Sequence, residues 1–286
     1  MTPKHRTPRR SAKSPARPAA QDLRNRWERL HQGDCEPWPD ERLIVRCRRR
    51  SRAFAAWLEA GEGPTVLAQR LQQAWQEFHG GEFAAAIEHG SELGALGVSA
   101  ANKAAAVDTL HFGGSTAEAL HILEAAISRG ERAVELLPDY PNAHYLLALV
   151  LGRYSQRISI LKALGAGLAG RVRNHLERTL QLEPQHAEAH VAFGLYHAEI
   201  VGKLGALAAA LTYGVSRDAA IEHFKHALEF APHSPIVHIE YANGLLLLDA
   251  GRYREQARTL YATAAAFEPA DAMERLDVER ARRGVR

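Results

Sequence analysis

Cysteine is scarce in this sequence: Cys35 and Cys47 are its two cysteines in 286 residues. They form no C-x-x-C pair, so the sequence predicts neither a metal clip nor a disulfide framework. Long apolar runs are missing too, because the longest, residues 204–213, has about half the roughly 20 residues that span a bilayer. The first residues contain no apolar signal-peptide core. Since few cysteines suit a reducing compartment, we expect a cytoplasmic chain without a membrane span.

Sequence motifs for catalysis are also missing. There is no H-E-x-x-H zinc motif, no phosphate-binding P-loop and no G-x-S-x-G nucleophile turn. The glycines at Gly165 and Gly167 follow no strand, because they lie in an apolar stretch with a helical pattern. No part of the chain alternates apolar and polar residues as a strand does, so we expect an all-α fold. We expect no enzyme activity, no catalytic residues and no cofactor, which leaves binding as the class of function.

Charge is divided unevenly along the chain. Residues 1–52 hold 15 Lys and Arg against 6 Asp and Glu, although the whole chain has a net charge of only +3. Residues 1–20 carry no acidic residue and little apolar bulk, so we expect a disordered basic tail. Five arginines between Arg46 and Arg52 could contact phosphates, but no aromatic residues are interleaved with them. A solvated face is the favoured interpretation, and a nucleic-acid contact through residues 1–52 is the alternative.

The strongest pattern is an internal repeat. One three-residue pattern occurs four times. It starts with a small or aliphatic residue, has a second residue four positions later, and ends with a proline eight positions after that. The four copies are Ala126, Gly130 and Pro138; Val172, Leu176 and Pro184; Ala220, Phe224 and Pro232; and Ala257, Tyr261 and Pro269. A second phrase, with a histidine at a fixed place, precedes three of them: His144, Leu147, Ala148 and Leu151; His190, Phe193, Gly194 and His197; His238, Tyr241, Ala242 and Leu245. The small residues let two helices approach, the large ones fill the gap, and the proline separates consecutive helices.

This pattern resembles the tetratricopeptide repeat, over residues 67–281 and least well at residues 101–110. The repeats are longer than usual because apolar inserts, residues 155–170 and 200–214, separate their two helices. The enlarged form is similar to the T-component proteins of TRAP transporters and to the regulator-of-microtubule-dynamics proteins. The resemblance implies a right-handed solenoid of helical hairpins, in which we expect the inserts to be helices.

Three parts follow along the chain. We expect the basic tail in residues 1–20, Arg-rich N-terminal helices in residues 21–62, and the solenoid with its C-terminal capping helix in residues 63–286. Within the second part, residues 41–60 are expected to form one helix. Ser115 and Glu118 form a capping-box pattern, and Ser234 before Pro235 has the form of a helix start.

The resemblance also implies a site. In the family, four positions of each first helix line the concave face, and the matching residues here are Asn142, Tyr145, Leu149, Arg153, Glu188, Val191, Leu195, Glu199, Ile236, Ile239, Asn243 and Leu247. The family's carboxylate clamp for chaperone tails needs lysine at the fifth position, where this chain has Tyr145, Val191 and Ile239. We therefore expect a scaffold that binds a protein or peptide with apolar anchors. One alternative is a module that binds an apolar small ligand between the inserts, with the inserts also forming the contacts of a homo-oligomer. The other alternative is an adaptor that binds nucleic acid.

Histidine is abundant, with 15 in the chain. His186, His190 and His197 could share one helix face and hold a metal ion. However, His144, His190 and His238 recur at one place in the repeat, and a recurring ring indicates packing or ordinary hydrogen bonding. We favour the second interpretation and assign no metal site.

Overall fold

The computed structural model describes residues 17–59, 62–112 and 114–285. Within these ranges the regular structure is helical, with no strand, which confirms the all-α prediction. Residues 1–16, most of the tail expected to be disordered, lie outside the described residues. The helices in chain order are α1 (Ala20–Leu30), α2 (Glu41–Arg50), α3 (Arg52–Glu59), α4 (Pro64–His79), α5 (Phe83–Glu92), α6 (Val98–His111), α7 (Thr116–Leu136), α8 (Pro141–Ser155), α9 (Ile160–Gly165), α10 (Leu168–Leu182), α11 (Ala187–Leu204), α12 (Ala206–Tyr213), α13 (Arg217–Phe230), α14 (Pro235–Ala266) and α15 (Ala272–Gly284).

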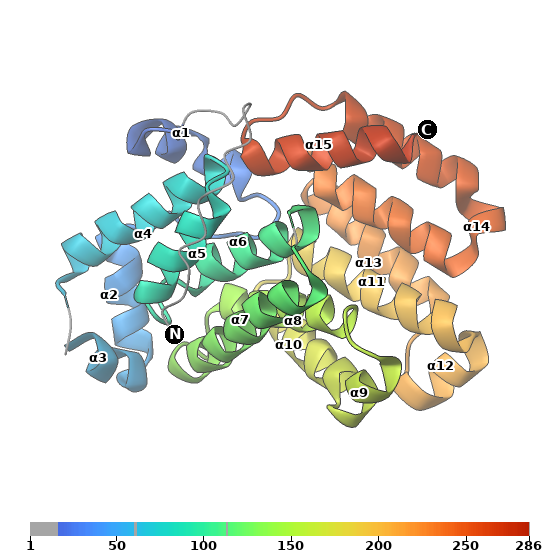
Figure 1. Cartoon of the computed structure of the whole chain (residues 1–286), viewed down its shortest axis with the longest axis horizontal. Helices are drawn as coiled ribbons and strands as arrows, with labels where there is room; N and C mark the ends of the chain where they lie inside the picture. Colours follow the sequence, from blue (N-terminus) through green and yellow to red (C-terminus); the bar gives the residue numbers. More distant parts are fainter. Residues whose placement is uncertain (1–16, 60–61, 113, 286) are drawn as a thin grey trace.

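From α4 onward the helices stack as pairs (Figure 1). Helix α4 packs on α5, α6 on α7, α8 on α10, and α11 on α13, while first helices also contact one another from pair to pair. The fifth pair is the two halves of α14, which are separated at Asp249, where φ is −171° and ψ is 93°. Helix α15 packs along α14 at the end of the stack. The fold is therefore the predicted tetratricopeptide-like helical solenoid.

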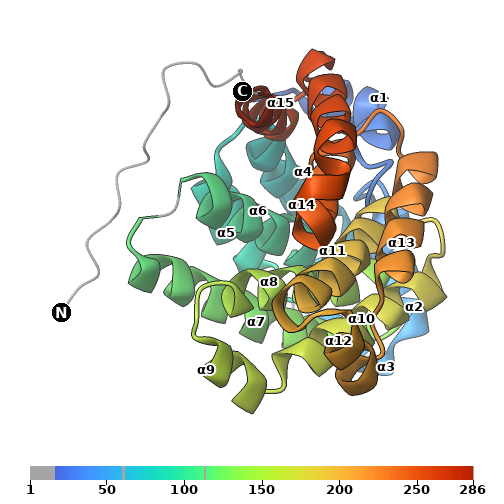
Figure 2. The ribbon, with the colours of Figure 1, turned by 90° about the vertical axis from the view of Figure 1, so that its right-hand side faces the viewer.

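The two apolar inserts are helical, as predicted. They form α9 and α12, each placed between the two helices of its repeat. Figure 1 shows both at the lower edge of the molecule, and in Figure 2, seen from the end of the stack, α9 stands apart from α12. Leu207 and Leu211 of α12 point outward, with 76% and 81% of their surfaces exposed.

One prediction about helix ends is wrong. The stretch expected as one helix forms two helices over its described residues 41–59, because Ser51 is extended, with φ of −133° and ψ of 115°. Its hydroxyl accepts a hydrogen bond from the backbone N–H of Phe54 and donates one to a carbonyl of α7, so this residue both starts α3 and attaches it to the solenoid. Ser234 directly precedes α14, and Pro235 is its first residue, as predicted, although the Ser234 hydroxyl makes no capping bond. The capping box of Ser115 and Glu118 is also formed as predicted.

The N-terminal helices share one core with the start of the solenoid. Leu23 and Trp27 of α1 and Ile44 of α2 are buried in the same cluster as Trp75 of α4. The rings of Trp27 and Trp75 meet edge to face with centroids 5.5 Å apart. The boundary at residue 62 stays a prediction, but burial of these side chains ties residues 20–59 to α4.

The recurring histidines make recurring hydrogen bonds. In His144 and His190, Nε2 donates to the carbonyl of the proline six residues earlier, at 3.0 and 3.1 Å. In the neutral ring Nδ1 is then a hydrogen-bond acceptor, and it accepts from Nδ1 of His175 at 3.1 Å in His144 and from Nδ1 of His223 at 2.9 Å in His190. His238, in the third copy, instead bonds the carbonyl four residues earlier at 3.0 Å. The ring at this position thus packs and hydrogen-bonds between helices, as the pattern predicted.

Phe224 shows why the repeat needs small residues. Its ring lies between Gly194 of α11 and Gly244 of α14. A Cβ atom on Gly194 would meet the ring at 2.6 Å, and one on Gly244 would meet it at 2.2 Å. The ring is completely buried, so it has nowhere to move.

We predict that Gly194→Leu lowers the free energy of unfolding by at least about 1–3 kcal/mol, because the added side chain overpacks the contact with Phe224. Urea denaturation measures the change. Gly152→Ala is the matched control, since this glycine is also helical and a Cβ there would meet nothing within 4 Å. Alanine at position 152 should stabilise the protein by up to about 1 kcal/mol. An unchanged midpoint for Gly194→Leu would contradict the register of the repeat.

Candidate functional site

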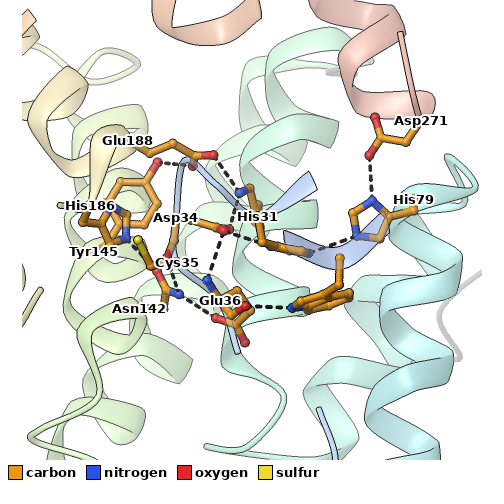
Figure 3. A network of polar contacts seen from close by, with 12 residues as sticks. His31, Asp34, Cys35, Glu36, His79, Asn142, Tyr145, His186, Glu188 and Asp271 are labelled. Carbon is orange, nitrogen blue, oxygen red and sulfur yellow. Dashed lines mark hydrogen bonds and ion pairs between the residues drawn. The ribbon is translucent and has the colours of Figure 1, made fainter. Parts of the chain in front are cut away.

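The concave face of the solenoid is crossed by the chain itself. Residues 31–36, here called the crossing segment, belong to the connection between α1 and α2 and run along the first helices of the repeats (Figure 3). The backbone N–H of Glu188 donates to the carbonyl of Gly33 at 2.8 Å, and the Asn142 amide donates to the carbonyl of Asp34 at 2.9 Å. The crossing segment is thus held by backbone as well as side-chain hydrogen bonds.

Lys103 is the central charge of this site. Its ammonium group is buried, bonds the Asp34 carboxylate, and lies 2.9 Å from Oε1 of Glu188. The hydroxyl of Tyr145 donates to the other oxygen of Glu188, also at 2.9 Å. Burial alone would lower the pKa of Lys103, but the two carboxylates outweigh it and raise the pKa. Lys103 is therefore a permanent cation that links the crossing segment to α11.

The two acids that share this ammonium group respond differently because Asp34 also faces His31. Burial raises the pKa of Glu188 above its usual value, and the contact with Lys103 only partly offsets this effect. For Asp34 burial also favours the neutral acid, but His31 and Lys103 together lower its pKa below the usual range. Asp34 is therefore the carboxylate that the site holds in its charged form.

A second chain of contacts runs from the crossing segment through α4 to the start of α15. Nδ1 of His31 donates to Asp34 at 2.9 Å, and Nδ1 of His79 donates to the Asp271 carboxylate at 2.6 Å. The two Nε2 atoms then face each other at 3.2 Å, a contact that is a hydrogen bond only when one ring carries both of its protons. Burial lowers the pKa of His31 to about 4. Since Asp271 caps α15, these contacts attach the last helix to the crossing segment.

Glu36 ends the crossing segment in a different environment. Its carboxyl group accepts hydrogen bonds from the Tyr140 hydroxyl at 2.7 Å and the Asn142 amide at 2.6 Å. Burial raises the pKa of Glu36 to about 7. The indole N–H of Trp27 donates to the backbone carbonyl of Glu36 at 2.7 Å, which fixes the segment against α1.

Cys35 lies between these anchors with a backbone φ of 51°, in the left-handed region that side chains rarely adopt. Both Cys35 and Cys47 are free thiols, and both line a hollow of about 450 Å³ between α2 and the turns that flank α8 and α10. Burial raises the pKa of Cys35 to about 12 and that of Cys47 to about 11, so neither thiol is activated.

Three of the residues expected to line the groove contact the crossing segment or its anchors. Asn142 bonds Asp34 and Glu36, and Glu188 bonds Gly33 and Lys103. Tyr145 reaches the segment through Glu188. These positions on the concave face are thus filled by the protein's own chain.

A further five expected residues lie between the helices of the stack or beneath α15, the C-terminal helix. Ile239 is completely buried against α15, and Val191 is buried between α11 and α13. Arg153 and Asn243 contact the carboxylate of Glu240, at 3.8 and 2.7 Å, where Arg280 of the cap also binds it. Ile236 lines a small cavity near the start of α14.

The remaining four residues form one strip that the crossing segment does not contact. We call it the outer concave strip: Leu149 of α8, Leu195 and Glu199 of α11, and Leu247 of α14. Leu149, Leu195 and Glu199 are half-buried, and Leu247 is exposed. The structure therefore divides the twelve expected residues between a filled region and an open one.

The sequence analysis missed the crossing segment and its lysine. One signal was available, since Lys103 is the only charged residue in the alanine-rich stretch 98–107, where the match to the repeat is poorest. Helix α6 is buried on nearly every side, which explains that composition. Nothing local marked Asp34 as the partner of this lysine, because 69 residues separate them.

The chemistry available here is electrostatic attachment. Lys103 and Asp34 are engaged with each other, and among the described residues no group of three or more His, Cys, Asp or Glu side chains is arranged to hold a metal ion. In the same part of the chain, no helix is both long and apolar enough to cross a membrane.

We predict that Lys103→Met destabilises the fold by about 3–5 kcal/mol, because it leaves the buried Asp34 and Glu188 without their cation. Chemical denaturation at neutral pH measures the loss. Adding Asp34→Asn to this variant should restore part of the lost stability, since one of the two orphaned acids becomes neutral. Equal stability of Lys103→Met and the unmodified protein would disprove the central role of this cation.

Stability should also depend on pH through His186. Burial lowers its pKa from 6.5 to about 3 in the folded protein, so the unfolded chain binds the extra proton first as the pH falls. The contribution of this residue is therefore complete above about pH 6.5 and decreases towards pH 3, by about 1.4 kcal/mol per pH unit. His186→Asn keeps a capping side chain and should reduce the slope of unfolding free energy against pH between 6 and 4. Identical slopes for the two proteins would exclude this contribution.

Comparison with known proteins agrees with this architecture. Residues 101–281 match the family model described as regulator of microtubule dynamics protein 1-3. The fold is similar to the crystal structure of a thermophilic TPR protein from Thermus thermophilus, with a TM-score of 0.54 and 18% sequence identity over 75% of this chain and 98% of that one. No curated protein matches the sequence. The family model covers more than half of the chain, and the chain therefore belongs to the regulator of microtubule dynamics protein 1-3 family.

Proposed function

We propose that this protein is a non-catalytic interaction module that binds a segment of a partner protein on its outer concave strip. The observation that carries the proposal is the division of the concave face. The crossing segment fills the part around Asn142 and Glu188, while Leu149, Leu195 and Leu247 remain accessible on three consecutive first helices. A row of apolar side chains on parallel helices suits an extended or helical segment with apolar anchors.

The inserts extend this surface. Leu204, near the end of α11, is 48% exposed, and Leu207 and Leu211 of α12 continue the apolar surface beyond the strip. Gly202 of α11 lies against the carbonyl of Leu247, so the strip and the insert are adjacent. Exposed apolar side chains gathered in one place are typical of protein-binding surfaces.

A small apolar ligand enclosed by the inserts is less well supported. The hollow beside Cys35 and the small cavity at the start of α14 are not lined by residues of α9 or α12. The arginines of α2, such as Arg46, Arg49 and Arg50, are exposed, so a nucleic-acid contact stays the second candidate. Deleting residues 1–52 would not test it cleanly, because α1 and α2 contribute core residues to the solenoid.

We predict that Leu247→Glu weakens partner binding by about tenfold or more, because a carboxylate replaces an apolar anchor. Val66→Glu is the matched control: Val66 is 44% exposed and Leu247 is 45% exposed, but Val66 lies on α4, away from the strip. A photo-crosslinking amino acid at position 247 would first identify the partner in cells of the source organism. Binding of that purified partner to each variant is then measured by calorimetry.

The competing candidates give different results in the same assay. Equal binding by Leu247→Glu and Val66→Glu would reject the strip as the binding surface. Loss of binding in a variant with Arg46, Arg49 and Arg50 changed to glutamine, together with a steep dependence on salt, would favour a nucleic-acid partner.

A further inference from the structure

A small cavity lies between the crossing segment, α11, the start of α14 and α15. Its volume of about 40 Å³ exceeds the roughly 10–15 Å³ that one water molecule needs. It therefore has room for a few water molecules or for a small polar head group. Its walls include Gly33 and His31 of the crossing segment, so the cavity exists because that segment occupies the concave face.

Asp277 of α15 lines this cavity without a matching partner among the described residues. The residue is 3% exposed, and its Oδ2 atom is buried without a hydrogen bond. Arg280 on the same helix attracts this carboxyl group, but its guanidinium donates to Glu240 of α14 at 2.8 Å. Burial raises the pKa of Asp277 well above its usual value, and the nearby Glu240, Asp271 and Glu188 raise it further.

A buried carboxyl group without a partner costs free energy that the fold must supply elsewhere. A ligand that brings a positive charge and N–H donors would remove this cost. Ser234 also lines the cavity, and its hydroxyl makes no capping bond, so the lining offers a second oxygen.

The charges around the cavity favour a cation over an anion. Glu188, Asp271, Glu274 and Asp277 supply four carboxyl groups to the lining, against the two permanent cations Arg29 and Lys103. Arg29 is engaged with Glu274 at 2.9 Å, and Lys103 is engaged with Asp34 and Glu188. Asp277 is the acid of this lining that these cations leave unpaired. Because the described residues gather no set of three metal-ligating side chains, an organic cation suits the cavity better than a metal ion.

We propose that this cavity binds a primary ammonium group, with Asp277, which releases its proton to solvent on binding, as its carboxylate partner and Ser234 as a second acceptor. An ammonium head with three N–H donors fits the size of the cavity and these two oxygens. The group can belong to a free small amine or to a lysine side chain of a protein. This inference does not depend on partner binding at the outer concave strip, which lies on other residues.

The test uses the full chain and two probes at constant ionic strength. Methylammonium chloride represents the free amine, and the peptide acetyl-Gly-Lys-Gly-amide represents the lysine side chain. Calorimetric titration should give saturable binding of at least one probe to the unmodified protein. Tetramethylammonium, which has no N–H donor, should not bind.

Two variants decide whether Asp277 is responsible. Asp277→Asn keeps the shape and removes the charge, and it should weaken binding at least about tenfold through loss of the charge-assisted hydrogen bond. Glu279→Gln, an exposed carboxylate on the same helix that does not line the cavity, should bind as the unmodified protein does. Far-UV circular dichroism and thermal unfolding check that each variant is folded.

The outcomes separate the two sources. Saturable binding of methylammonium that is lost in Asp277→Asn supports a site for free amines. Binding of the lysine peptide alone, lost in the same variant, supports a site for a protein's lysine. Saturation by neither probe, binding that survives in Asp277→Asn, or equal binding of tetramethylammonium would overturn the proposal.

Discussion

The structure depends on one buried cation. Lys103 emerges from a helix that is surrounded on nearly all sides, and it satisfies Asp34 and Glu188 at the same time. Without this ammonium group, two acids would lie in a low-dielectric interior without compensation, and the crossing segment would lose its central attachment to the repeats. The other contacts of the segment are arranged around this point: His31 and His79 extend it to α15, and Asn142 extends it to α8. This lysine is therefore the central attachment of the segment that fills part of the concave face.

Much of the fold could be predicted from the sequence because its signals are local. The spacing of the prolines gave the helix pairs, and the small residues gave the close contact around Phe224. The capping box of Ser115 and the helical nature of the inserts were also correct. Each of these features depends on residues within about one repeat of one another, a range over which propensity and periodicity are informative. The break at Ser51 was missed because the serine that causes it is stabilised by α7, far along the chain.

The site could be predicted only in part, and the reason is distance along the chain. The resemblance to the tetratricopeptide family identified the concave positions, including Asn142 and Glu188, but it could not reveal what contacts them here. Their partners are Asp34 and Lys103, which are 108 and 85 residues away from them, respectively. A buried ion pair leaves no periodic trace in a sequence, whereas a repeated proline does. Polar residues at the concave positions, such as Asn142 and Glu188, therefore fit two interpretations: they bind an external ligand, or they bind another part of the same chain.

The crossing segment also changes how this solenoid should fold. In a simple repeat stack each unit touches only its neighbours, so stability is nearly a sum of local terms and the ends can fray independently. Here a segment near the start of the chain bonds residues of α4, α6, α8 and α11. It is also linked to α15 through His79 and Asp271, which are 192 positions apart. Such distant contacts close large loops, which slows folding but couples the repeats. The array should unfold as one cooperative unit, so loss of the first helices should also destabilise the last helix.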